Sequence, residues 1–79
     1  MIETISDKVR FIISDVAELE IDEIGFNNDL IDDLGIDSMM TLEIVTELER
    51  TFHIKLEEED LQDITDVNSV IKVVSKKIK

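Results

Sequence analysis

The chain has no cysteine, a single histidine, only eight basic residues and no long apolar run. Without cysteine it can form neither a disulfide framework nor a thiolate metal site, which is compatible with a reducing cytoplasm. It also has no thiol of its own on which to hold a thioester. No apolar run approaches the about 20 residues that a membrane-spanning helix needs, and no signal-peptide pattern is present. We therefore expect a soluble, cytoplasmic protein without a membrane span.

Groups suited to catalysis are equally scarce. His53 is the only histidine, and no second nucleophile, base or metal ligand is placed to pair with it, although a general base needs an oriented partner. No phosphate-binding loop or cluster of metal ligands appears either. The sequence thus favours a protein that is not an enzyme.

The charge is strongly negative and unevenly spread. Twenty acids against eight bases give a net charge of −12 over 79 residues, which argues against a nucleic-acid partner and favours partners with basic patches. Residues 18–37 contain acids but no base, whereas Lys72, Lys76, Lys77 and Lys79 make the C-terminus basic. A solvated surface that keeps the protein soluble explains part of this pattern. The more specific hypothesis is that the acids form a face on which partner proteins dock.

Length and periodicity predict one small helical domain, residues 1–79, acting as a monomer. Apolar residues recur at the helical period over residues 3–17, 38–52 and 67–78, and a shorter helix is expected near 57–62. No segment shows strand alternation. The fold class is therefore all-α, a four-helix bundle with a short third helix and a long loop between helices one and two. The stripes are Ile5, Val9, Ile12, Ile13 and Val16; Thr41, Ile44, Val45, Leu48 and Phe52; and Val67, Val70, Ile71, Val74 and Ile78. Phe11 lies off the first stripe, so we expect it to be partly exposed.

The long connection, residues 18–37, contains both glycines and a turn signal at Asn27-Asn28-Asp29. Loops of this length are ordered only when their own side chains anchor them. We expect five anchors, namely Ile21, Ile24, Leu30, Ile31 and Leu34. The acids do not follow the ligand order of an EF-hand around either glycine, so a dedicated calcium loop is not expected, although loose binding of divalent cations stays open.

The segment Leu34-Gly35-Ile36-Asp37-Ser38-Met39-Met40 joins this loop to the second amphipathic helix. Asp37 and Ser38 both favour helix starts, so the spacing predicts a helix beginning at Ser38. On these residues alone, Ser38 could simply be a helix cap.

A family resemblance extends over most of the chain. Four stretches of the sequence are together similar to the signature of acyl carrier proteins. They are the series from Asp33 to Met39, Thr41-Leu42-Glu43-Ile44-Val45, Glu47-Leu48-Glu49, and Phe52. Ile64-Thr65-Asp66-Val67 resembles the start of that family's last helix. The resemblance implies that Ser38 carries a 4'-phosphopantetheine derived from coenzyme A, with Asp37 as its motif neighbour, and that acyl groups travel as thioesters on the thiol of that arm.

The resemblance also implies partners, namely a phosphopantetheinyl transferase and the acyl-transferring and chain-extending enzymes of fatty acid, polyketide or related biosynthesis. The helical wheel places a mixed apolar and acidic arc beside Ser38, which we interpret as the partner face: Met39, Met40, Glu43, Thr46, Glu47 and Arg50. Stand-alone fatty-acid carriers usually have acids at the positions of Met40 and Arg50, and often a proline at that of Glu57. These departures leave the pathway open.

A second hypothesis comes from another functional class, because Ser38 could be only a cap in an acidic helical adaptor or cation-binding protein. Treatment with coenzyme A and a phosphopantetheinyl transferase distinguishes the two hypotheses.

The charge imbalance leads to a first prediction. Because 20 acids and 8 bases share a small surface, self-repulsion should weaken the fold at low ionic strength. Moderate salt or magnesium should therefore raise the melting temperature, measured by circular dichroism. A melting temperature that does not change between low and moderate salt would show that the acids are already compensated.

Overall fold

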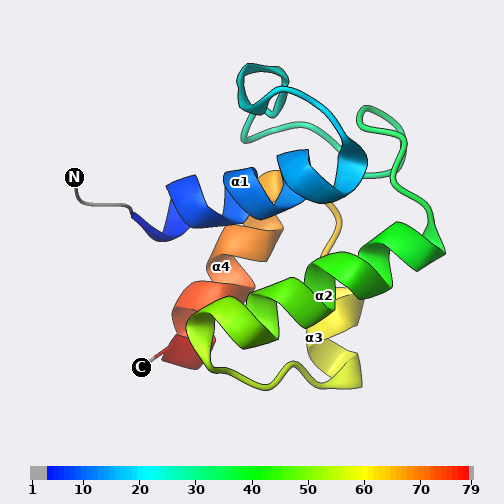
Figure 1. The fold of residues 1–79 in the computed structure, drawn as a ribbon. Coiled ribbons are helices and arrows are strands. Elements are labelled where there is room, and N and C mark those ends of the chain that lie inside the picture. Colours follow the sequence, from blue (N-terminus) through cyan, green and yellow to red (C-terminus); the bar gives the residue numbers. More distant parts are fainter. Residues whose placement is uncertain (1–3, 79) are drawn as a thin grey trace.

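The computed structural model describes residues 4–78. It contains helices α1 (Ile5–Ala17), α2 (Ser38–Phe52), α3 (Glu58–Gln62) and α4 (Val67–Ile78), with a short 3-10 helix, η1 (Ile21–Glu23), in the long connection (Figure 1). Within these residues the only strand-like feature is an isolated bridge between Asp29 and Asp66. The expected all-α fold with a short third helix is confirmed. No helix in the described part of the chain is long and apolar enough to cross a membrane.

The helix ends follow from their capping residues. The Thr4 side chain accepts a hydrogen bond from the Asp7 N–H at 3.1 Å and begins α1. Residue 3, where we expected this helix to start, lies outside the described residues. Glu57 caps α3 rather than belonging to it. The only histidine, His53, ends α2 in the left-handed conformation, with φ 56°.

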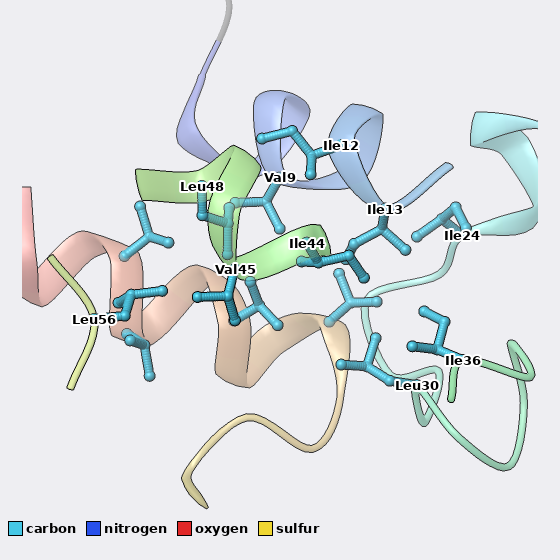
Figure 2. Close-up of a cluster of buried hydrophobic side chains, with 14 residues drawn as sticks. Val9, Ile12, Ile13, Ile24, Leu30, Ile36, Ile44, Val45, Leu48 and Leu56 are labelled. Atoms are coloured by element: carbon cyan, nitrogen blue, oxygen red, sulfur yellow. The ribbon is translucent and has the colours of Figure 1, made fainter. Parts of the chain in front are cut away.

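One core of 14 buried residues joins the helices and the connection (Figure 2). Helices α1, α2 and α4 supply most of it, as the periodicity predicted. α3 contributes no buried residue, and Leu56, just before it, is the nearest core side chain. The core consists of Val9, Ile12, Ile13, Ile24, Leu30, Ile36, Ile44, Val45, Leu48, Leu56, Val67, Val70, Val73 and Val74.

The predicted loop anchors were partly wrong. Ile24 and Leu30 are buried and Leu34 is half-buried, but Ile21 is 37% and Ile31 is 69% exposed. Ile36, which we did not choose, is almost completely buried. Side-chain direction in a loop follows its individual turns and not a period, so hydrophobicity alone could not select the anchors.

The last helix, α4, also departs from its predicted stripe. Ile78 is exposed in the final turn, and Val73 is buried instead. The regular stripe was therefore wrong at Ile78 in the last turn, and it missed Val73 in the middle of α4.

The long connection is fastened to the start of α4 by backbone hydrogen bonds. The N–H groups of Val67 and Asn68 donate to the carbonyls of Asn28 and Phe26, at 3.2 and 3.0 Å. In return, the Leu30 N–H donates to the Thr65 carbonyl at 3.0 Å. These bonds supply partners both for the first N–H groups of a helix, which have none within it, and for loop backbone that would otherwise be unpaired.

Arg10 fastens the other end of the connection to α1. Its Nε donates to the Ile24 carbonyl at 2.9 Å, and its Nη2 donates to the Ile21 carbonyl at 3.0 Å. The guanidinium also lies 5.1 Å from the centroid of the Phe26 ring. One side chain therefore holds three loop residues.

Two ion pairs are found among residues 4–78. Arg50 pairs with Glu47 at 3.6 Å within α2, and Lys77 of α4 pairs with Asp60 of α3 at 2.9 Å. Hydrogen bonds from the Glu57 N–H and from Lys77 hold the pKa of Asp60 below its ordinary value. The second pair ties the otherwise weakly packed α3 to the bundle.

The Arg10 contacts predict a specific loss of stability. Replacing Arg10 with methionine keeps much of the apolar stem but removes both hydrogen bonds, so the free energy of unfolding should fall by about 1–3 kcal/mol in urea titrations. Arg10→Lys is the control, because lysine keeps the charge but lacks the two-pronged donor geometry, and it should recover only part of the loss. An unchanged unfolding curve for Arg10→Met would contradict this role.

Candidate functional site

Asp37 fixes the start of α2. Its backbone is extended, and its side chain accepts a hydrogen bond from the Met40 N–H at 2.9 Å. Its carbonyl accepts both the N–H and the hydroxyl of Thr41, each at 2.9 Å. The helix therefore begins at Ser38, as the sequence predicted.

The residues before Asp37 hold this start against the core. Ile36 is buried, and its N–H donates to the Leu30 carbonyl at 2.9 Å. Gly35 has a φ of 69°, a conformation that residues with a side chain adopt only at a cost. Ser38 consequently lies two residues after a buried anchor.

Ser38 is exposed at the first position of α2. The unpaired N–H groups at a helix start carry a partial positive charge, which favours a covalently attached or bound anion. The first turn of α2 contains no acidic residue. Asp37 is exposed and next to the hydroxyl, so solvent screens its repulsion of an added phosphate. The site can hold a phosphodiester on an accessible hydroxyl.

The surface beside Ser38 differs in two places from the predicted partner face. Met40 is half-buried and packs against the core cluster, because the helix turns its side chain toward the bundle. Leu42, which we did not include in this face, is 60% exposed, and Met39 is 74% exposed. Met39 and Leu42 lie three residues apart and form the apolar part of this surface. A more detailed analysis of the helical wheel could have included Leu42 in the predicted partner face in place of Met40.

The polar members of the predicted face do lie on the surface. Glu43, Thr46 and Arg50 are exposed and Glu47 is half-buried. The ion pair between Arg50 and Glu47 partly cancels the charge of that acid, an arrangement that the sequence did not reveal. Exposed pairs of this type contribute little to stability.

An exposed serine that begins the second helix of a small acidic bundle is the arrangement expected of a carrier with a covalently attached arm. The family described as "Phosphopantetheine attachment site" matches residues 7–74. The chain belongs to this family, and it is an acyl carrier protein that takes a covalently attached 4'-phosphopantetheine and is not itself an enzyme.

Relatives of full carrier length are similar over nearly the whole chain. The acyl carrier protein of Thermotoga maritima is 33% identical over 76 residues, which cover 96% of this chain and 94% of that protein. A solved structure of the Mycobacterium tuberculosis protein Rv0033, a proposed acyl carrier protein, superposes with a TM-score of 0.86 at 30% identity and covers 92% of this chain and 97% of that one.

Part of a much larger protein is also similar. The non-reducing polyketide synthase dbaI of Emericella nidulans is 42% identical over 72 residues, which cover 91% of this chain but only 3% of the synthase. The chain thus spans a very small part of this relative.

Proposed function

We infer that Ser38 is the attachment residue and that the protein presents its acyl cargo from the start of α2. The observation that carries this proposal is the exposed hydroxyl at the first position of α2, held there by the Asp37 cap. On modification the Ser38 Oγ loses its proton and bonds to the phosphorus next to pantetheine, while the pyrophosphate bond of coenzyme A breaks and adenosine 3',5'-bisphosphate leaves. The transferase supplies the chemistry, and this chain supplies an accessible, fixed nucleophile.

The surface of α2 supports a docking role in the same proposal. Met39 and Leu42 offer apolar contact beside Ser38, and Glu43 and Glu47 offer acidic groups to basic patches on transferases and chain-extending enzymes. The acidic-adaptor alternative accounts for the charge but not for the match over residues 7–74.

We assign the protein to a dedicated pathway, such as polyketide synthesis, rather than to general fatty-acid synthesis. Met40 and Arg50 replace expected acids, and Arg50 further neutralises Glu47. The similarity to a carrier segment of a polyketide synthase supports the assignment. Similarity to the Thermotoga maritima acyl carrier protein extends over a comparable length, so the pathway rests on the residues of α2.

Modification of Ser38 can be tested by intact mass. Incubation with coenzyme A and a broad-specificity phosphopantetheinyl transferase should add one phosphopantetheine to the wild type and none to Ser38→Ala. Ser75→Ala is the matched control, because Ser75 is an exposed helical serine in α4, and it should be modified in full. A mass gain in Ser38→Ala, or none in the wild type, would refute the assignment.

Pathway preference can be tested by changing the charge of α2. Arg50→Glu, alone and with Met40→Asp, should make the holo-protein a better substrate for a fatty-acid ketosynthase with a basic entrance. Each surface charge change is worth about 0.2–1 kcal/mol, so kcat/KM of the double variant should rise about twofold to thirtyfold, mainly at low salt.

Lys72→Glu is the control for this experiment, because it makes the same change in net charge on an exposed residue of α4. It should leave kcat/KM nearly unchanged. A melting curve must accompany Met40→Asp, since Met40 packs against the core. If the wild type is as good a substrate as Arg50→Glu, these residues carry no pathway preference.

A further inference from the structure

A groove follows the seam between α1 and α2, the two helices that cross the middle of Figure 1. It consists of two hollows of about 490 and about 400 Å³. The first begins at Met39, next to Ser38, and the second ends at Lys8 and Thr51. Both are lined by Asp15 of α1 and Glu47 of α2, so they adjoin one another.

Exposed apolar side chains line this groove from both helices. Met39 and Leu42 of α2 lie in the first hollow, and Phe11 of α1, which is 63% exposed, lies in the second. Phe11 is outside the core cluster. Aromatic residues that remain on a surface beside other apolar groups are frequent anchors of protein interfaces.

The polar lining of the groove is mainly acidic. Asp15, Glu18, Glu43 and Glu47 line it, although Glu47 is also paired with Arg50, and Lys8 is the one base among the lining residues. Lys8 lies at the far end of the groove, where its Nζ is 5.9 Å from the centroid of the Phe52 ring. The groove therefore combines exposed apolar side chains with acidic groups along most of its length.

We propose that this groove is a docking site for an amphipathic segment of a partner enzyme, with an apolar stripe flanked by lysine or arginine, and that Phe11 anchors its far end. The inference rests on the proposed carrier function and extends the docking surface from α2 to α1. A helix that lays an apolar stripe into a groove while its flanking bases meet acids uses a common mode of recognition. The acids favour such a segment over the uncharged acyl cargo, which gains nothing from them.

The extension gives α1 a role in choosing partners. Enzymes whose basic patch reaches only α2 would contact Met39 and the acids near Ser38, whereas an enzyme with a longer amphipathic segment would also contact Phe11. Truncating Phe11 should therefore discriminate between partners and not weaken all of them equally.

The test uses a defined probe, a helical peptide of leucine and lysine with leucines at positions i, i+3, i+4 and i+7. Titration into the 15N-labelled holo-protein should shift the amide signals of the groove residues in α1 and α2. Phe11→Ala should raise the dissociation constant about five- to tenfold, because loss of one buried aromatic anchor commonly has an effect of this size. Asp15→Asn should weaken binding mainly at low salt.

Phe26→Ala is the matched control, since Phe26 is also a partly exposed phenylalanine but lines neither hollow. It should bind the peptide like the wild type. Equal weakening by Phe11→Ala and Phe26→Ala, or a preference of the peptide for the acids of residues 57–60 at α3, would overturn the proposal.

The cargo alternative is distinguished by loading the arm in the absence of peptide. If an acyl chain on the holo-protein shifts the signals of Phe11 and Leu42 as strongly as the peptide does, the groove holds cargo and the docking proposal fails. The intact-mass experiment distinguishes failure of the docking proposal from failure of the carrier function. If the protein is not a carrier, its mass will not increase on treatment with coenzyme A and the transferase.

Discussion

The position of Ser38 depends on an exchange of hydrogen bonds between the long connection and the start of α4. A loop exposes backbone groups that need partners, and a helix start exposes N–H groups that need acceptors. Here the carbonyls of Phe26 and Asn28 meet the first N–H groups of α4, and the Thr65 carbonyl meets the N–H of Leu30. The Leu30 carbonyl in turn accepts a hydrogen bond from the Ile36 N–H, and this bond fixes the backbone just before Asp37, the residue that caps α2.

Burial makes this arrangement stable enough to be ordered. Ile24, Leu30 and Ile36 enter the core from a segment without a regular period, and each fully buried apolar side chain contributes about 1.5–3 kcal/mol. That gain opposes the conformational entropy lost when the connection is fixed. Three apolar anchors and one arginine thus order a segment whose acids remain available at the surface.

The sequence predicted those features that depend on local rules. Periodicity located the helices, and the preference of Asp37 and Ser38 for helix starts located the serine. It could not distinguish Ile36 from Ile31 as an anchor, because the direction of each depends on turns made by Asp29 and Gly35. It also did not show that Met40 is half-buried while Leu42 is exposed, because a helical wheel gives the angle of a side chain and not the width of the contact with neighbouring helices.

The groove between α1 and α2 belongs to the features that no local rule could predict, because it requires the placement of one helix beside another. Phe11, Met39 and Leu42 are each ordinary exposed residues when considered alone, and only the fold brings them to one seam. None of them belongs to the core. If the groove docks partners as we propose, substitutions at these positions should alter the choice of partner at little cost in stability, because none of these side chains is buried in the core. A carrier must also leave each enzyme quickly. Acidic groups at the border of the groove would speed association, and a small number of apolar anchors would keep the residence time short, so the proposed groove suits this requirement.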